Sequence, residues 1–356
     1  MSSVLVAMSG GVDSSVAAAM LKERGHDVVG VTFKNFDRND LPGEPSLKNC
    51  CSLESLNNAR QTCMTFGIPH YVLNRVEQFE RQVLEDFRTT YLSGLTPNPC
   101  IRCNSFVRWP ELDRLAKELG IDFIATGHYA RIIKKDDRSL IFRAADKTKD
   151  QSYALWAIKP DFLDRTLLPI GDYPKNRIRE IAADYKLKNA AYPESQDICF
   201  VPEGDYADIV GQSAPGPIVD DSGRILGEHK GLTRYTIGQR KGLGISNPMP
   251  LYVLKLDVNE NKLVVGPEES IFRSTFTVKL TNWFIAAQPQ TTIKCIAKIR
   301  YRHEPASCAV LIQENACARV EFEEPQRAIT PGQSAVFYIH DMLIGGGVID
   351  SVEHRN

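Results

Sequence analysis

The 356-residue sequence has no long apolar run. A helix that crosses a bilayer needs roughly 18 or more consecutive apolar residues, and no stretch approaches that length. The N-terminus also lacks a basic segment followed by a long apolar stretch, so we expect no secretory signal. With 43% hydrophobic and 24% charged residues, the composition is typical of a globular protein. We therefore expect a cytoplasmic protein with no membrane partner.

The sequence also has almost no net charge, because 43 basic and 44 acidic residues give a formal charge of −1. Domains that bind nucleic acid are often strongly basic, and this total does not indicate one. A local basic face is nevertheless enough to hold a phosphate backbone. The net charge therefore leaves the class of partner open.

Two common nucleotide-binding signatures are missing. The absence of a Gly-Lys pair excludes a P-loop, and the absence of GxGxxG excludes the dinucleotide fingerprint. Instead, SGGVDSS at residues 9–15 lies where a short apolar strand leads into an alanine-rich helix that ends near Gly25. Glycines let the backbone approach an anion, and the free N–H groups of a helix N-terminus point at it. Asp13 fits such a site if a magnesium ion is shared with the nucleotide.

Strands and helices alternate through the first 200 residues. Two continuous apolar stretches, at residues 4–7 and 28–33, are typical of strands buried on both faces of a parallel sheet. A later helix carries apolar residues at every fourth position from Phe79 to Tyr91. The alternation predicts a doubly wound α/β domain over residues 1–205, whose ligand lies outside the carboxyl ends of the strands.

The sequence changes in character after about residue 205, where glycine, proline and short alternating segments dominate. Residues 252–266, YVLKLDVNENKLVVG, predict a strand–turn–strand hairpin. Later runs such as TFTVKL and CAVLIQ predict the strands of a small sandwich or barrel. We therefore expect a small central β-rich domain at residues 206–272 and a C-terminal β-barrel domain at residues 273–356.

The nine cysteines are an odd number and are unevenly spread. In a reducing cytosol they favour metal binding or catalysis over a disulfide framework. We expect Cys63 to lie on the buried face of a helix. We also expect three cysteines of the β-rich tail to be small buried residues, namely Cys295, Cys308 and Cys317.

Cys100 and Cys103 belong to TPNPCIRCN, a proline-stiffened loop that leads into a helix. A cysteine at a helix N-terminus beside Arg102 should have a lowered thiol pKa and hence more thiolate. Far downstream, Cys199 lies in the polar segment SQDICF. Nucleotide activation together with two reactive thiols favours a reaction in which a carbonyl oxygen is activated and replaced by sulfur.

Seven motifs occur along the chain in one order, namely SGGVDSS, ATGHYAR, KTKDQSY, SQDICF, YTIGQRKGLGI, KIRYRH and AITPGQSAVFY. Together they resemble the tRNA-specific 2-thiouridylase family, from about residue 4 to about residue 348. SGGVDSS alone is shared by many ATP pyrophosphatases, and the later motifs make the resemblance specific. The resemblance implies an ATP pyrophosphatase domain of the adenine nucleotide alpha-hydrolase-like fold, followed by β domains of which the C-terminal one contacts tRNA.

The resemblance also implies roles for individual residues. ATP, with Mg²⁺, adenylates the C2 oxygen of the wobble uridine, and Cys199 carries a persulfide received from a sulfur-relay protein such as a cysteine desulfurase. Cys103 either helps release sulfide or resolves the persulfide as a Cys103–Cys199 disulfide. The implied ATP-binding residues are Ala7, Met8, Ser9, Gly10, Gly11, Val12, Asp13, Ser14, Phe33 and Gly127. The implied tRNA-binding residues are His128, Lys149, Asp150, Gln151, Arg300, Tyr301 and Gln333. We expect a monomer.

Some of these positions are also supported by the residues themselves. Phe33 and Gly127 each end a predicted strand, where ligands of parallel sheets lie. Phe33 could equally be a core residue, whereas a side chain at Gly127 would block the nucleotide. Lys298, Arg300 and Arg302, on one predicted strand segment, indicate a basic edge for phosphate, with a solvated strand face as the alternative.

The chain departs from the family pattern at Cys100, where many members carry aspartate. Cys100, Cys103 and Cys199 could present three thiolates to an iron–sulfur cluster, leaving one coordination site open to deliver sulfide. A structural zinc site and thiol chemistry without a metal are the alternatives. We interpret Cys50 and Cys51 as a loop feature near the active site.

Two other functions are compatible with parts of the sequence. An ATP pyrophosphatase of the amide-ligase type would add ammonia to an adenylated group, but no glutaminase-like region is present and the cysteines would stay unexplained. A non-catalytic tRNA-binding or metal-binding module could retain an inactive nucleotide loop, and the intact SGGVDS argues against it.

Overall fold

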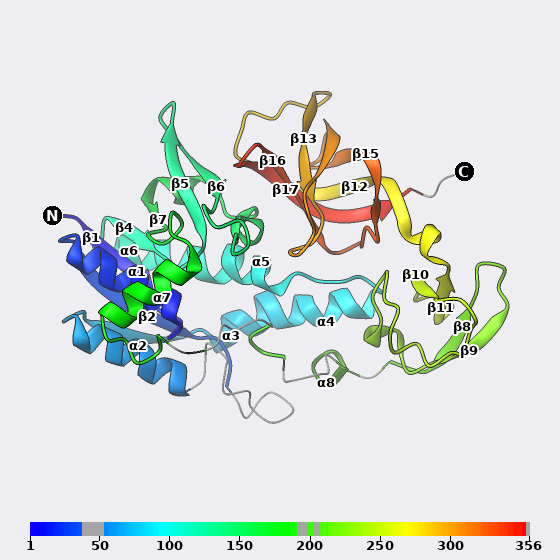
Figure 1. The fold of residues 1–356 in the computed structure, drawn as a ribbon, viewed down its shortest axis with the longest axis horizontal. Coiled ribbons are helices and arrows are strands. Elements are labelled where there is room, and N and C mark those ends of the chain that lie inside the picture. Colours follow the sequence, from blue (N-terminus) through cyan, green and yellow to red (C-terminus); the bar gives the residue numbers. More distant parts are fainter. Residues whose placement is uncertain (38–52, 191, 193–197, 202–206, 212, 354–356) are drawn as a thin grey trace. The chain divides into compact units, whose positions relative to one another are not determined.

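The computed structural model describes residues 1–37, 53–190, 192, 198–201, 207–211 and 213–353 (Figure 1). The chain forms two compact units. The first comprises Met1–Val83, Cys100–Glu203 and Asp341–Leu343, and the second comprises Leu84–Pro99, Gly204–His340 and Ile344–Asn356. The predictions for Cys50 and Cys51, and the first three residues of SQDICF, lie outside the described residues.

A five-stranded parallel sheet forms the centre of the first unit, in the order β3-β2-β1-β4-β7. Its strands are β1 (Ser3–Ala7), β2 (Asp27–Lys34), β3 (His70–Asn74), β4 (Phe123–Ala125) and β7 (Thr166–Leu167). The chain winds outward from β1 to β3 and then returns to the other side of β1 with β4, so the strand order reverses between β1 and β4. This topology confirms the predicted doubly wound α/β domain.

The longer helices of this unit are α1 (Val12–Glu23), α2 (Leu53–Thr65), α6 (Trp109–Glu118) and α7 (Lys175–Asp184). Three fully buried alanines of α1 lie at residues 17–19, and their small side chains let α1 pack closely on the sheet and on α2 and α7. Gly25 follows α1 with a φ of +84°, which is the left-handed conformation that a helix end favours. α6 packs against β1 and β4.

Short helical segments and a hairpin complete the first unit. They are α3 (Val76–Phe79), η2 (Glu80–Leu84), α5 (Pro99–Cys103), η3 (Asn104–Arg108), η4 (Ser152–Leu155), η5 (Pro160–Arg165), β5 (Ala130–Lys135) and β6 (Arg138–Arg143). The hairpin β5–β6 was not predicted from the sequence. η2 and η3 are π-helical, and such segments are rare and often occur at functional sites. Among the described residues, no helix is long and apolar enough to cross a membrane.

The second unit contains a four-stranded sheet in the order β10-β11-β8-β9. Its strands are β8 (Gly216–Val219), β9 (Ile225–His229), β10 (Tyr252–Asp257) and β11 (Lys262–Gly266). Antiparallel pairing of β10 with β11 confirms the hairpin predicted at residues 252–266. The helical segments of this unit are α4 (Glu85–Leu92), α8 (Ala207–Val210), η6 (Leu232–Arg234) and η7 (Glu268–Ile271).

A closed β-barrel of six strands forms the rest of the second unit, in the order β12-β15-β14-β13-β16-β17, with β17 pairing back to β12. The strands are β12 (Phe272–Trp283), β13 (Thr292–Lys298), β14 (Ala306–Ile312), β15 (Ala318–Arg327), β16 (Ser334–Ile339) and β17 (Met342–Val352). Closure leaves no open strand edge in the barrel. The structure therefore confirms a barrel and decides against a sandwich.

The cysteines outside the predicted site follow the expectations only in part. Cys63 is buried in α2, and burial raises the pKa of its thiol to about 12. Cys308 is buried in β14, with its Sγ 3.6 Å from the Sγ of Cys295 on β13. Cys295 and Cys317 are only half-buried, so the prediction of burial was wrong for these two.

Phe276 and Phe272, both on β12, give a direct test of the barrel core. Phe276 is fully buried with its ring 5.7 Å from that of Phe322, whereas Phe272 is 38% exposed. We expect Phe276→Ala to lower the free energy of unfolding of the barrel by about 3–5 kcal/mol, because it leaves a cavity. Phe272→Ala should cost about 1 kcal/mol or less. Urea unfolding followed by far-UV circular dichroism measures both losses, and equal losses would contradict this packing.

Candidate nucleotide and thiol site

Two loops leave the sheet where its strand order reverses. One connects β1 to α1, and the other, residues 126–129, follows β4. Because β1 and β4 are neighbouring parallel strands, both loops lie at the same edge of the sheet. This is the edge at which doubly wound sheets bind ligands.

SGGVDSS forms the turn from β1 into α1. Gly10 has a φ of +76°, and a Cβ there would collide with the backbone carbonyl of Ser55. The Ser14 hydroxyl donates to the Gly11 carbonyl at 3.1 Å and accepts from the Ser9 N–H at 3.1 Å. No side chain among the described residues caps α1, so its first-turn N–H groups can bind an anion.

Gly127 lies directly against this loop. A Cβ at Gly127 would be 2.6 Å from the Ser14 nitrogen and 2.7 Å from the Asp13 carbonyl carbon. Both atoms belong to the backbone and cannot move aside as a flexible side chain could. Glycine at this position therefore leaves room for the loop itself, and its predicted contact with a nucleotide stays a prediction.

Three apolar residues of the predicted ATP-binding set have buried side chains. Met8, Val12 and Phe33 are among the core residues of the unit. Phe33 lies near the carboxyl end of β2, as predicted, with its ring buried as in the alternative interpretation. Met8 and Val12 can therefore line a nucleotide site mainly through their backbone atoms.

Asp13 is held by two residues that the sequence did not single out. The Lys175 Nζ, at the start of α7, lies 2.7 Å from Oδ1 and 2.9 Å from Oδ2 of the Asp13 carboxylate. The Tyr129 hydroxyl donates to Oδ1 at 2.9 Å. The sequence signal for Lys175 was only its position at a helix start, which is unusual for a cation.

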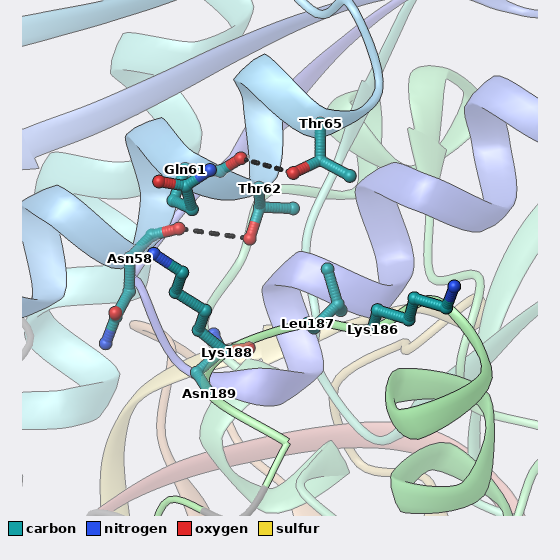
Figure 2. A pocket seen from close by; sticks show the side chains of 8 residues that line it. All are labelled: Asn58, Gln61, Thr62, Thr65, Lys186, Leu187, Lys188 and Asn189. Carbon is teal, nitrogen blue, oxygen red and sulfur yellow. Dashed lines mark hydrogen bonds between the residues drawn. The ribbon is translucent and has the colours of Figure 1, made fainter.

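A third residue that the sequence did not single out, Asn189, holds the glycine loop by hydrogen bonds. Its Nδ2 donates to the Gly10 carbonyl at 2.9 Å and to the Ser15 hydroxyl at 3.0 Å. Thr62 of α2 also donates to the Ser15 hydroxyl, at 3.2 Å. Thr62 and Asn189 belong to a small pocket of about 50 Å³. Figure 2 shows the residues that line it, namely Asn58, Gln61, Thr62, Thr65, Lys186, Leu187, Lys188 and Asn189.

His128 connects the region of the glycine loop to the helical run at residues 99–118, called the cysteine helix because it carries Cys100 and Cys103. A hydrogen bond of 2.8 Å joins its Nδ1 to the Thr126 hydroxyl, and its Nε2 lies 3.5 Å from Nη1 of Arg108 in η3. The same Nη1 donates to Asn104, which directly follows Cys103, at 2.6 Å. Burial, together with the Arg108 charge, lowers the pKa of His128 to about 3, so the imidazole is neutral at physiological pH.

Cys100 and Cys103 lie one turn apart on a continuous helical run formed by α5, η3 and α6. Cys100 is in the first turn and exposed, whereas Cys103 is the last residue of α5 and buried. The cysteine at the helix N-terminus is therefore Cys100. Cys199 is half-buried.

The segments that carry Cys103 and Cys199 are both attached to one helical stretch, residues 76–84. Phe200, which follows Cys199, packs its ring 5.7 Å from that of Phe79. Arg102, which precedes Cys103, donates from Nε to the Gln82 carbonyl at 3.3 Å. The residues next to the two predicted catalytic cysteines therefore contact the same helical stretch.

The structure gives the iron–sulfur and zinc alternatives no support. Within the described part of the chain, which includes Cys100, Cys103 and Cys199, no three His, Cys, Asp or Glu side chains are grouped so that they could hold a metal ion.

Three predicted tRNA-binding residues of the first unit, Lys149, Asp150 and Gln151, lie in a loop that is hydrogen-bonded to Tyr129. Gln151 accepts from the Tyr129 N–H at 2.9 Å and donates its own N–H to the Tyr129 carbonyl at 2.7 Å. The Asp150 carboxylate is buried and accepts from the Ala144 N–H at 2.9 Å and the Ser152 hydroxyl at 2.9 Å. Asp150 therefore holds the loop in its conformation. The neighbouring Lys149 is half-buried.

The prediction that Lys298, Arg300 and Arg302 lie on one strand segment was wrong, whereas their contact with phosphate stays a prediction. β13 ends at Lys298, which is buried, with its Nζ 5.6 Å from the centre of the Tyr301 ring. Arg300 lies in the turn beyond the strand and donates to the Ala328 carbonyl and the Thr330 hydroxyl. Tyr301 and Arg302 of this turn are exposed.

Gln333, the last predicted tRNA-binding residue, contacts the loop ahead of the cysteine helix. Its Nε2 donates to the Pro97 carbonyl at 3.1 Å and lies 3.3 Å from the Thr96 carbonyl. The neighbouring Pro331 carbonyl accepts from the Thr96 N–H at 3.0 Å. In this structure Gln333 therefore helps to fix the TPNP segment.

Three domain families match the chain in sequence. They are described as a tRNA methyl transferase HUP domain at residues 2–203, a tRNA methyl transferase PRC-barrel domain at residues 206–267 and an aminomethyltransferase beta-barrel domain at residues 273–349.

Several curated proteins are similar over the full length. The tRNA-specific 2-thiouridylase MnmA of Moorella thermoacetica is 48% identical over 355 residues, covering 98% of this chain and 99% of that protein. The proteins of the same name from Chloroflexus aggregans and Geotalea uraniireducens are 47% and 44% identical, again over 98% of this chain and over 98% and 94% of their own lengths.

Gly127→Ala tests the contact between the two loops. The added methyl group would collide with the backbone at Asp13 and Ser14, so we expect ATP affinity to fall by about 10-fold or more. Gly227→Ala is the matched control, because the added methyl group there meets only the Ile245 side chain. Calorimetric titration of both variants with ATP measures the effect, and wild-type affinity in Gly127→Ala would contradict it.

His128 should make stability depend on pH. Its pKa is about 3 in the folded state and about 6.5 when unfolded, so between these values only the unfolded chain binds the proton. The free energy of unfolding should therefore fall as the pH drops below about 6.5, by up to about 1.4 kcal/mol per pH unit. His128→Gln should reduce this slope, and a part should remain because burial also lowers the pKa of His70 and of His303. His340→Asn, at an exposed position, should leave the slope unchanged. Urea unfolding at pH 7.5 and 5.5 provides the measurement, and an unchanged slope in His128→Gln would refute the assignment.

Proposed function

This chain belongs to the tRNA-specific 2-thiouridylase family and forms 2-thiouridine in tRNA, and from that premise we propose a mechanism of ATP-dependent adenylation followed by transfer of a persulfide sulfur. The observation that best supports it is the link from the glycine loop to the cysteine helix through the end of β4. Gly127 contacts the loop, and the adjacent His128 contacts Arg108, five residues after Cys103. Nucleotide chemistry and thiol chemistry can therefore share one edge of the sheet.

In the first step, the C2 oxygen of the wobble uridine attacks the α-phosphorus of ATP and pyrophosphate leaves. The uncapped N–H groups of α1 would hold the departing pyrophosphate, as helix N-termini hold anions. Asp13 is the carboxylate of the loop that can share a magnesium ion with the phosphates. Adenylation turns the C2 oxygen into a good leaving group.

In the second step, Cys199 carries the sulfur as a persulfide, whose terminal sulfur attacks C2 while AMP leaves with the former C2 oxygen. The Cys103 thiolate then attacks the Cys199 sulfur, forming a Cys103–Cys199 disulfide and leaving sulfur on C2. A dithiol reductant must afterwards reduce this disulfide. In a variant of this scheme, Cys103 first releases the terminal sulfur as sulfide, which then attacks C2.

For tRNA binding, the two units offer different kinds of residue. Lys149 can contribute charge, and Tyr301, with 46% of its surface exposed, can stack on an unpaired base. We propose that Asp150, Gln151, Arg300 and Gln333 act mainly by holding the segments around them, since each has hydrogen bonds within the protein. His128 would act as a neutral hydrogen-bonding group.

The sulfur must come from another protein, and a cysteine desulfurase or a sulfur-relay protein can supply a persulfide to Cys199. We propose that the enzyme works as a monomer in the cytoplasm, where tRNA and reducing thiols are available. Neither the amide-ligase alternative nor a non-catalytic module accounts for Cys103 and Cys199, whose neighbouring residues both contact the stretch at residues 76–84.

Cysteine variants separate persulfide chemistry from cluster chemistry. In single-turnover reactions with ATP, tRNA and a persulfide donor, we expect Cys199→Ser and Cys103→Ser to lower 2-thiouridine formation by at least about 10³-fold. Cys199→Ser should still release pyrophosphate when tRNA is present, because adenylation needs no thiol. Cys100→Ser is the matched control and should retain thiolation, since Cys100 has no role in the persulfide route.

The same reactions are run on anaerobically purified protein with iron and acid-labile sulfide assays. Thiolation only in the iron-loaded protein, together with loss of activity in Cys100→Ser, would favour the cluster and overturn the persulfide proposal. If neither preparation forms 2-thiouridine, the proposed mechanism fails altogether.

A further inference from the structure

We infer that Lys175 is a positioning residue of the nucleotide site, which neutralises and orients Asp13 so that the loop can accept a polyphosphate. The inference rests on the proposed ATP-dependent function and adds a residue and a mechanism to it. It starts from the charge of the glycine loop.

The loop has no cationic side chain of its own. Residues 7–15, AMSGGVDSS, contain one charged side chain, Asp13, and it is negative. A carboxylate beside a polyphosphate repels it unless a cation reduces the local negative charge. In a P-loop, a lysine of the loop itself reaches the phosphates. Here the cation comes from α7, far along the chain.

The position of Lys175 in α7 is unfavourable by local rules. It is the first residue of a ten-residue helix, where the macrodipole opposes a positive charge, and the first turn contains no acidic residue. Its side chain is also buried, with 9% of its surface exposed. Residues that contradict local preferences in this way are often functional. The Asp13 carboxylate compensates this positive charge, together with the Asp146 carboxylate, which accepts from the Lys175 backbone N–H at 3.2 Å.

The contacts hold the carboxylate in one orientation. Lys175 bonds to both oxygens of Asp13, and the Tyr129 hydroxyl adds a second hydrogen bond to Oδ1. Asp13 is the more accessible partner, with 30% of its side chain exposed against 9% for Lys175. A ligand entering from the open edge would therefore meet Asp13 first, with its charge already balanced by the ammonium group behind it.

The effect of Lys175 on phosphate binding should therefore depend on Asp13. If Lys175 acts through Asp13, removing the lysine exposes an uncompensated negative charge, and removing both charges restores a neutral site. If Lys175 binds phosphate directly, removing both charges leaves phosphate binding weak. If it serves stability alone, phosphate binding by the folded protein does not change.

Calorimetric titration of the full-length protein with inorganic pyrophosphate, without magnesium or tRNA, distinguishes these cases. We expect Lys175→Met to weaken pyrophosphate binding by about 10-fold or more, as one charge at this range would. The double variant Lys175→Met/Asp13→Asn should bind within about three-fold of wild type. Arg177→Met, in the same helical turn but paired with Glu180 on the surface, is the matched control and should bind as wild type does.

Magnesium provides a second readout that a purely structural role would not change. Titrated with Mg²⁺ alone, Lys175→Met should bind the ion more tightly than wild type, because the competing ammonium group has gone. Lys175→Arg, which keeps the charge, should stay close to wild type in both titrations. Thermal melts identify any variant that fails to fold, and the double variant, which leaves no single buried charge, then carries the test.

Each outcome is decisive. Unchanged pyrophosphate binding in folded Lys175→Met overturns the inference and leaves the proposed function intact. A double variant as weak as Lys175→Met also overturns it, in favour of direct phosphate binding. Absence of pyrophosphate binding in wild type would instead contradict the proposed nucleotide site itself.

Discussion

The backbone contact between the end of β4 and the start of α1 constrains the rest of the first unit. Because Gly127 has no side chain, residues 126–129 can run against the glycine loop. Its neighbours make the other connections. His128 bonds to Thr126 and contacts Arg108 in the helical run that carries Cys103, and Tyr129 donates to Asp13. Four consecutive residues thus join the nucleotide loop, its acidic residue and the thiol helix.

The two thiols are supported by an irregular helical framework. Residues 76–84 pass from α-helix to π-helix at Glu80, and residues 99–118 do so at Asn104, directly after Cys103. A π-turn changes the direction of side chains relative to a regular helix, and natural proteins retain this less favourable geometry mostly where function requires it. Here the first stretch holds the flanks of Cys103 and Cys199 through Gln82 and Phe79.

The sequence predicted those features that depend on local pattern. Apolar runs gave the parallel sheet, alternating segments gave the barrel, and the glycine motif was placed at the correct turn. The helix from Phe79 to Tyr91 was predicted from an apolar period of four, longer than the 3.6 of an α-helix, and the structure has a π-segment within it. Patterns could not predict Lys175 or Asn189, whose partners lie more than 160 residues away.

Errors in the sequence analysis arose where a residue's type was clear but its surroundings were not. For Gly127 the contact with a nucleotide stays a prediction, and the structure adds that the backbone of the glycine loop leaves no room for a side chain there. Lys298 and Arg300 are basic, but the strand ends between them and both are used inside the protein. Charged residues at the site are likewise used inside the protein. Asp13 forms an ion pair with Lys175, and Asp150 forms one with Arg143. Charges of this kind organise loops, so attraction of tRNA has to depend on the exposed residues that remain.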